Sequence, residues 1–141
     1  MLVLDVLKGV VAVLMAGPGA GTYLQAALAA AAVAGHNWPV WLRGRGGKGL
    51  ATAAGALSLV TPIAVPVWGV IWGLGYVVSG YIVVGTLAAT VLIAPAIGIL
   101  AGWGFGLAML PCCILILVRH REKVRRLLRG AEPRHYWRAA P

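Results

Sequence analysis

Apolar runs alternate with short turn-forming breaks along the whole chain. The apolar segments are residues 1–16, 22–35, 50–60, 63–78, 82–100 and 105–118. A helix that crosses a bilayer needs about 20 apolar residues. The pattern therefore predicts an all-α integral membrane protein, a single polytopic domain with about six transmembrane helices. Because the third and fourth segments are short and interrupted by proline, five spans or a re-entrant third segment are alternatives.

The composition agrees with a membrane protein and disagrees with an ordinary soluble domain. Hydrophobic residues make up 61% of the 141 positions and charged residues only 11%, whereas soluble domains carry about 25% charged residues. A signal peptide does not explain this bias, because apolar segments recur along the whole length. The adjacent Cys112 and Cys113 lack metal-ligand spacing and are poorly placed for a disulfide, so we expect no metal site.

The charges are distributed asymmetrically. Of the twelve basic residues, one is Lys8, three lie at positions 43–48, and eight lie in a basic tail at 119–141. With six spans, both termini, the basic loop and the turn at Ser79 fall on one side, and the opposite turns carry no positive charge. Cytoplasmic loops of membrane proteins are enriched in Lys and Arg. The loop and the C-terminus are therefore expected to be cytoplasmic, and the net charge of +9 does not indicate a nucleic-acid partner.

A basic, glycine-rich loop lies between the second and third apolar segments. Residues 44–49 read Gly-Arg-Gly-Gly-Lys-Gly and lead directly into the segment that begins at Leu50. Glycines allow backbone amides to approach a ligand, a helix N-terminus favours anions, and arginine binds phosphate oxygens in a bidentate manner. The loop is not a P-loop, because Gly follows Lys48 where that motif needs Ser or Thr. It predicts a phosphate or phosphoester site, or alternatively a flexible loop that follows the positive-inside rule.

Two histidines lie at the ends of apolar segments. His120 opens the tail between Arg119 and Arg121, and nearby positive charge opposes its protonation. A neutral imidazole can accept a proton or bond to a hydroxyl group. His36 closes the second segment, where an interface residue or a helix cap is the simpler interpretation.

The acidic residues are expected to be structural. Asp5 and Lys8 are three positions apart in the first segment, so they share a helix face and can pair. Glu122 lies among arginines and is expected to pair with them. The tail itself is typical of an amphipathic helix on anionic lipid.

Several stretches resemble a known family. Residues 35–41 (Gly-His-Asn-Trp-Pro-Val-Trp) with 46–52 (Gly-Gly-Lys-Gly-Leu-Ala-Thr) resemble the second signature motif of the PlsY family. These are bacterial membrane acylphosphate:glycerol-3-phosphate acyltransferases. The stretches His-Arg-Glu, Arg-Leu-Leu and Gly-Ala-Glu, within residues 120–132, resemble the third motif. The segment 4–9 resembles the start of the family's second membrane helix, and 79–81 a further cytoplasmic turn. The order matches along essentially the whole chain.

The resemblance implies a reaction and a set of site residues. The family transfers a fatty acyl group from acyl phosphate to the 1-hydroxyl of sn-glycerol 3-phosphate, without a cofactor, at the bacterial cytoplasmic (inner) membrane. The products are lysophosphatidic acid and phosphate, and the partners are the two substrates and membrane lipid. His120 and Lys48 are the implied catalytic residues. The residues implied to hold phosphate or substrate are His36, Arg45, Gly46, Gly47, Gly49, Thr52 and Ser79.

The chain departs from the family pattern at three places. The family's first motif, a Gly-Ser-Gly-Asn-rich loop with an essential serine and arginine, precedes the helix that starts here. Lys123 stands where asparagine is usual, and Val83 lies near the usual place of a serine. An N-terminally incomplete enzyme is therefore expected, or an inactive relative that binds lipid or a partner. A transporter is disfavoured because the spans contain few polar residues besides Asp5 and Lys8. The sequence fixes no oligomeric state.

Overall fold

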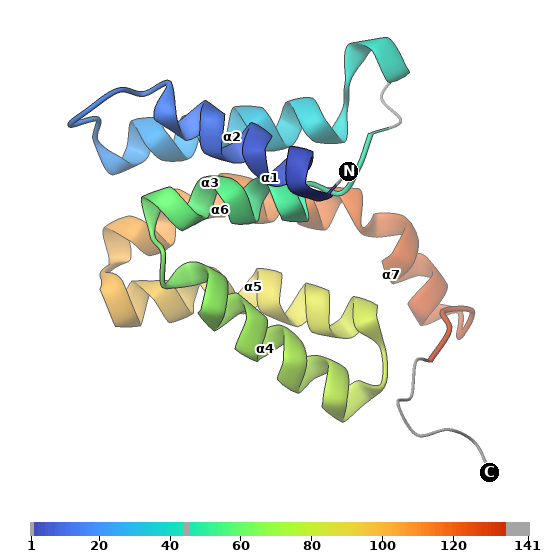
Figure 1. Cartoon of the computed structure of the whole chain (residues 1–141). Helices are drawn as coiled ribbons and strands as arrows, with labels where there is room; N and C mark the ends of the chain where they lie inside the picture. Colours follow the sequence, from blue (N-terminus) through green and yellow to red (C-terminus); the bar gives the residue numbers. More distant parts are fainter. Residues whose placement is uncertain (1, 44–45, 135–141) are drawn as a thin grey trace.

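The computed structural model describes residues 2–43 and 46–134, and these form helices joined by short turns (Figure 1). The helices are α1 (Leu2–Leu14), α2 (Thr22–Asn37), the 3-10 helix η1 (Val40–Leu42), α3 (Leu50–Val60), α4 (Ala64–Ser79), α5 (Ile82–Ala101), α6 (Trp103–Arg119) and α7 (Arg121–Leu128). No strand occurs in this part of the chain. The expectation of an all-α protein is confirmed.

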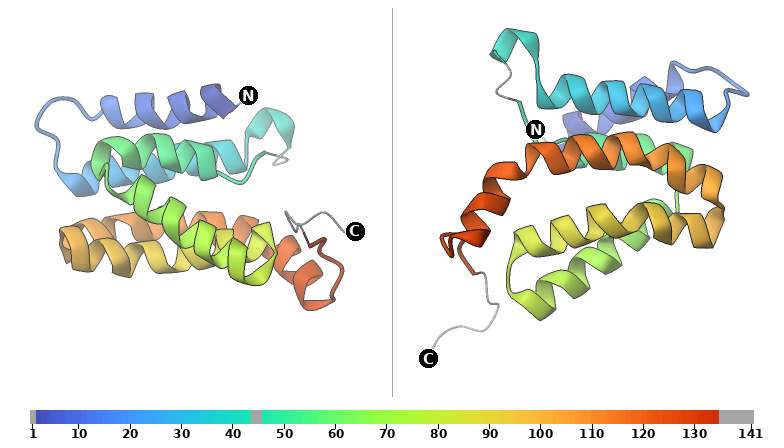
Figure 2. Two further views of the ribbon diagram at one scale, coloured as in Figure 1. Left: turned by 60° about the horizontal axis from the view of Figure 1, so that its bottom comes forward. Right: turned by 180° about the vertical axis from the view of Figure 1, so that it is seen from behind.

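The helices α1 to α6 run back and forth between two ends of the molecule (Figures 1 and 2). The turns near positions 18, 61 and 102 lie at one end. The start of α1, the glycine loop, the α4–α5 turn and α7 lie at the other end, which we call the basic end. The segments that carry the basic residues are thus brought together by the topology.

The helix boundaries differ from the expected segments at both ends of the molecule. The second helix continues two residues beyond the expected segment, through Asn37, and His36 lies in its last turn, at the helix end as expected. The last apolar helix starts at Trp103, directly after Gly102, whose φ of 109° ends α5. The expected tail contains a further helix, α7, which is bent by 53° from α6. Both prolines in α5 and α6, Pro95 and Pro111, lie within continuous helices.

Length separates one helix from the others as a candidate membrane span. Among the described residues, α5 alone is long and apolar enough to cross a bilayer, and α6 with α7 adds a second if the bent pair counts as one. The 11 residues of α3 rise only about 17 Å, whereas the hydrocarbon core is about 30 Å thick. Six individually sufficient spans are therefore not established by this criterion.

Small residues allow close approach between neighbouring helices. A Cβ atom at Gly9 would overlap the Thr52 carbonyl, and one at Gly55 would overlap the Val6 carbonyl, so α1 and α3 are in backbone contact. The α5–α6 pair uses Gly106 in the same way against the Ala94 carbonyl. Close packing through small residues is typical of helices in bilayers.

A partly open apolar cavity of about 90 Å³ lies between α3, α4, α5 and α6. Trp68 and Ile93 contribute to its wall, and so do the two free, buried cysteines, Cys112 and Cys113. Leu50 and Ile116 line it near the basic end. The cavity therefore extends from that end into the apolar interior.

Candidate active site

The glycine loop packs tightly on the C-terminal end of α2. The Gly47 amide donates to the His36 carbonyl at 3.1 Å. A Cβ atom at Gly46 would overlap the same carbonyl, and one at Gly47 would overlap the imidazole of His36. Gly49 has a φ of 78°, and a Cβ atom there would overlap the side chains of Val33 and Asn37. These glycines are therefore required for packing as well as for any approach of a ligand.

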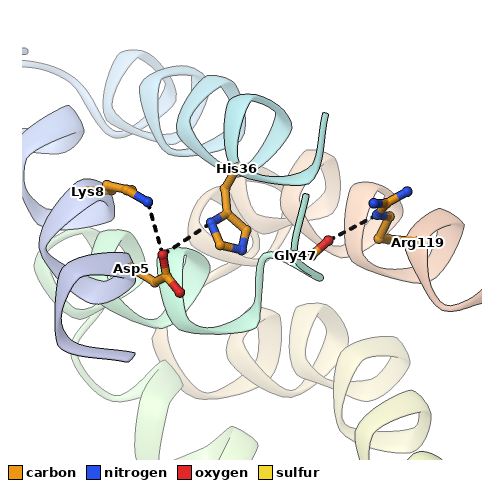
Figure 3. Close-up of polar contacts among 5 residues, drawn as sticks. All are labelled: Asp5, Lys8, His36, Gly47 and Arg119. Atoms are coloured by element: carbon orange, nitrogen blue, oxygen red, sulfur yellow. Dashed lines mark hydrogen bonds and ion pairs between the residues drawn. The ribbon is translucent and has the colours of Figure 1, made fainter. Parts of the chain in front are cut away.

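Arg119, the last residue of α6, holds the loop from the other side. Its Nε donates to the Gly47 carbonyl at 3.0 Å, and one terminal nitrogen donates to the Gly46 carbonyl at 3.0 Å. The guanidinium carbon lies 5.8 Å from the centre of the Trp38 ring. Figure 3 shows the bond from Arg119 to Gly47 beside the end of α2. The loop is thus tied to two helix ends.

An acidic residue of α1 supports His36. Asp5 Oδ1 lies 3.4 Å from His36 Nδ1 and 3.1 Å from Lys8 Nζ (Figure 3). The His36 ring therefore lies between Asp5 and Gly47. Asp5 and Lys8 pair as the spacing predicts, and this pair also orients the imidazole behind the loop.

His120 lies at the joint between α6 and α7 and is 2% exposed. Its Nδ1 is 2.8 Å from the Ile116 carbonyl. Because a carbonyl only accepts hydrogen bonds, Nδ1 carries the proton and the neutral ring keeps Nε2 as its acceptor. Burial lowers the pKa of His120, and the Lys48 and Lys123 ammonium groups lower it further, against the opposing effect of the Ile116 carbonyl. These effects favour the neutral form that the sequence predicts, but they come from burial and the two lysines rather than from Arg119 and Arg121.

Two lysines and a buried carboxylate surround this histidine. Burial lowers the pKa of Lys48, and the neighbouring Lys123 ammonium lowers it further, while Glu132 acts in the opposite direction. Lys123 Nζ donates to Glu132 Oε1 at 3.1 Å. Arg126 Nε lies 3.3 Å from Oε2 as an ion pair without hydrogen-bond alignment. The Glu132 side chain is only 6% exposed, so its charge needs these cations.

The start of α3 adds polar groups beneath the loop. Gly49 is the N-cap of α3 and has no side chain to cap it. Thr52, in the first turn, is fully buried, and its hydroxyl has no hydrogen-bond partner among the described residues. The side-chain amide of Asn37 donates to the Leu115 carbonyl at 3.4 Å, while its Oδ1 has no such partner. Thr52 thus lies behind the loop rather than on an open surface.

The remaining predicted residues have different surroundings. The Ser79 hydroxyl donates to the Gly75 carbonyl at 2.6 Å and accepts from the Tyr81 amide at 3.1 Å. Ser79 therefore ends α4 at the basic end. Glu122 lies 2.9 Å from Arg125 and is exposed. Arg45 falls outside the residues that the structure describes.

Sequence reasoning missed three contributors. In the sequence, Arg119 is only a charge next to His120, Lys123 only a departure from a motif, and Glu132 only part of a resemblance. One signal was available for Glu132. The chain has only three acidic residues, and a lone acid among arginines is usually paired.

The arrangement favours binding of an anion. All three acids are engaged with cations of the chain: Asp5, Glu122 and Glu132. Lys48 and Lys123 lie close enough to His120 to lower its pKa, and Glu132 pairs with Lys123 and Arg126. This group of described side chains has two more positive than negative charges. A phosphate dianion would balance them. The free Nε2 of His120 can at the same time accept a proton from a hydroxyl group.

Within the described residues no group of three His, Cys, Asp or Glu side chains lies close enough to hold a metal ion. The site has more cationic than anionic side chains, which suits a phosphate ligand rather than a metal ion.

The sequence matches one protein family along most of its length. A family profile described as glycerol-3-phosphate acyltransferase covers residues 1–130. The glycerol-3-phosphate acyltransferase of Halalkalibacterium halodurans is 38% identical, over 94% of this chain and 68% of that protein. The protein of the same name from Rubrobacter xylanophilus is 41% identical, over 91% of this chain and 65% of that protein. The chain spans about two thirds of the length of these relatives.

Solved structures agree with this match. The crystal structure of PlsY, an integral membrane glycerol 3-phosphate acyltransferase, in its glycerol 3-phosphate form superposes with a TM-score of 0.81. The sequences are 31% identical, and the match covers 96% of this chain and 69% of that one. The lysophosphatidic acid form of PlsY gives the same TM-score. By profile, sequence identity and fold, the chain belongs to the glycerol-3-phosphate acyltransferase family.

Proposed function

We propose that the chain transfers a fatty acyl group from acyl phosphate to the 1-hydroxyl of sn-glycerol 3-phosphate, giving lysophosphatidic acid and phosphate. The single observation that carries this proposal is the convergence of the glycine loop, Lys48 and His120 at one end of the helical bundle. Both substrates carry phosphate groups, and this end has uncompensated positive charge. Family membership supports the same reaction.

The protein does not need to activate the acyl donor, because acyl phosphate is already activated. The hydroxyl oxygen attacks the acyl carbon, and the carbon–oxygen bond to phosphate breaks as phosphate leaves with the electron pair. In our proposal Nε2 of His120 accepts the hydroxyl proton, which then passes to the departing phosphate. Lys48 and the loop amides stabilise the charge on phosphate in the transition state. Holding the two substrates together supplies the remaining acceleration.

The apolar cavity is the proposed place for the acyl chain. Its wall near the basic end includes Ile116, whose carbonyl accepts the hydrogen bond from His120. An acyl phosphate in this position would keep its phosphate among the cations and its hydrocarbon chain in the interior. Burial of apolar chain surface is worth about 25 cal/mol per Å², so the cavity contributes to donor binding.

The protein is a membrane protein, like its family, and we propose that it crosses the bacterial cytoplasmic membrane several times with the basic end in the cytoplasm. The separation of the two ends supports this orientation, because basic residues gather on the cytoplasmic side. At the basic end Val40 and Trp41 of η1 are 86% and 84% exposed. Tryptophan is enriched where membrane and water meet, so η1 suits the interface.

The direct test is acyl transfer from acyl phosphate to labelled glycerol 3-phosphate by the purified 141-residue chain in detergent or in a bilayer disc. We expect Lys48→Ala to reduce kcat/KM by about 100-fold or more, since a group that stabilises transition-state charge is typically worth that much. Turnover of the parent chain that Lys48→Ala leaves unchanged would refute the assigned site.

Arg125→Ala is the matched control for the loss of one positive charge. Arg125 lies on α7 at the same end, and its guanidinium pairs with exposed Glu122 at 2.9 Å. Surface ion pairs contribute little, so this variant should retain the activity of the parent chain. A folded parent chain without turnover would favour the alternative of an inactive relative.

A further inference from the structure

The joint between α6 and α7 contains two adjacent residues with different partners. His120 turns inward and bonds to the Ile116 carbonyl of its own helix. Arg119 reaches out of the helix to the glycine loop, 72 and 73 positions away in the sequence. One helix end therefore sets the position of both the histidine and the loop.

The guanidinium of Arg119 has several partners that fix its orientation. It donates to two successive carbonyls, those of Gly46 and Gly47, at 3.0 Å each. It also lies over the Trp38 ring. The planar fork of arginine suits two acceptors at once, whereas a lysine ammonium acts as a point charge. The contact is therefore specific to arginine.

The two bonds also determine which way the loop peptides face. The peptide bonds are trans, because no cis bond occurs among the described residues. In a trans peptide the carbonyl and the following amide point in opposite directions. With the Gly47 carbonyl on Arg119, the Lys48 amide points away from the guanidinium. The negative ends of these carbonyls are thereby neutralised, which lowers the repulsion that an approaching phosphate would meet.

The contact with Arg119 adds to the packing on α2 that orders the loop. Glycine loses more conformational freedom on folding than any other residue, and positions 46, 47 and 49 are all glycine. The bond from the Gly47 amide to the His36 carbonyl holds one side of the loop. The other side depends on Arg119.

We propose that Arg119 is a positioning residue that holds the glycine loop in register with His120, so that a substrate phosphate on the loop lies beside the imidazole. This inference rests on the proposed function. Arg119 does not itself need to contact the substrate. Its effect passes through the two carbonyl groups, and it should therefore appear in substrate affinity rather than in the chemical step.

The experiment compares Arg119→Gln and Arg119→Lys with Arg121→Gln. Arg121 flanks His120 on the other side, and its side chain is 72% exposed, so it is a matched control for the loss of charge. Each substrate is varied in turn. Arg119→Gln should raise the KM for the phosphate substrate on the loop by about ten- to 100-fold, which is the usual effect of losing hydrogen bonds to a charged group. The kcat should be nearly unchanged. Arg119→Lys should be intermediate, and Arg121→Gln should resemble the parent chain.

A second readout does not need turnover. Amide hydrogen exchange in peptides that contain Gly46 to Gly49 should be faster in Arg119→Gln than in Arg121→Gln, with exchange in α5 unchanged. Unchanged KM values, or equal loop exchange in the two variants, would overturn the proposal. A fall in kcat and thermal stability with KM unchanged would mean that Arg119 only supports folding. If the parent chain does not turn over, the proposed function fails, and the exchange comparison still decides whether Arg119 holds the loop.

Discussion

At the residue scale, the environment of His120 predicts a pH dependence of kcat that can be tested. Its pKa is lowered by burial and by Lys48 and Lys123, so it lies below the ordinary histidine value near 6.5. The ring is then neutral at pH 7 and becomes protonated only as the pH falls further. If neutral His120 accepts the hydroxyl proton, kcat should be constant near pH 7 and fall on the acid side with a midpoint below about 6.5.

Lys123→Met checks the cause of this shift. Removal of the Lys123 charge should raise the pKa of His120 and move the acid midpoint of kcat upwards, toward the value of a free histidine. NMR titration of the His120 ring in the parent chain and the variant measures the same shift without turnover. Arg129→Met, at the exposed end of α7, should leave the midpoint in place. If the acid midpoint of kcat is the same in Lys123→Met as in the parent chain, the charge of Lys123 does not determine the pKa of His120.

The site was only partly predictable from residues alone. Glycine spacing and adjacent charge indicated the loop, and the position of His120 between two arginines at the start of the tail indicated the histidine. The sequence could not show that Arg119 bonds to Gly46 and Gly47, because that contact joins segments more than 70 positions apart. The sequence also suggested that the glycines allow a ligand to approach the backbone. In the structure, much of the need for glycine comes instead from the close contact of the loop with His36.

At the element scale, helix packing through small residues leads to a second prediction. A methyl group at Gly55 would overlap the Val6 carbonyl of α1. Because backbone atoms cannot move aside cheaply, Gly55→Ala should destabilise the fold by about 1–3 kcal/mol, as overpacking of a core typically does. Thermal unfolding in detergent measures the effect.

Gly73→Ala is the matched control, because a Cβ atom there would have no heavy atom within 4 Å. Replacing glycine by alanine in an open helical position lowers the conformational entropy of the unfolded chain and so stabilises the folded protein by about 0.4–1 kcal/mol. Opposite signs for the two variants are therefore expected. A loss of stability at both positions would mean that helix contacts do not determine the cost.

The elements themselves were largely predictable, since helices lie close to each of the six apolar segments. The basic tail is also typical of an amphipathic helix, and α7 is such a helix over residues 121–128. The apolar pattern placed the end of the second helix two residues too early, since α2 runs to Asn37. The local signal for this boundary is the Trp38-Pro39 pair, because a residue before proline disfavours helical geometry.

At the scale of the whole molecule, the separation of charge between the two ends predicts an orientation. The basic end gathers the loop, the α4–α5 turn and α7, and the opposite turns near 18, 61 and 102 carry no basic residue (Figure 1). The excess of Lys and Arg should keep the basic end in the cytoplasm. The substrates proposed above are cytoplasmic anions, so the same orientation gives the site access to them.

Single cysteines at the two ends test this orientation. Gly21 is exposed with no neighbouring heavy atom that a Cβ would meet, and Arg129 is exposed at the end of α7. In bacterial spheroplasts a membrane-impermeant maleimide should label Gly21→Cys, and it should label Arg129→Cys only after the membrane is opened. The parent chain is the control, because Cys112 and Cys113 are buried and should not react. The reverse pattern would place the basic end outside and separate the site from its proposed substrates. Equal labelling of both positions in spheroplasts would mean that the helices do not cross the membrane as an ordered bundle.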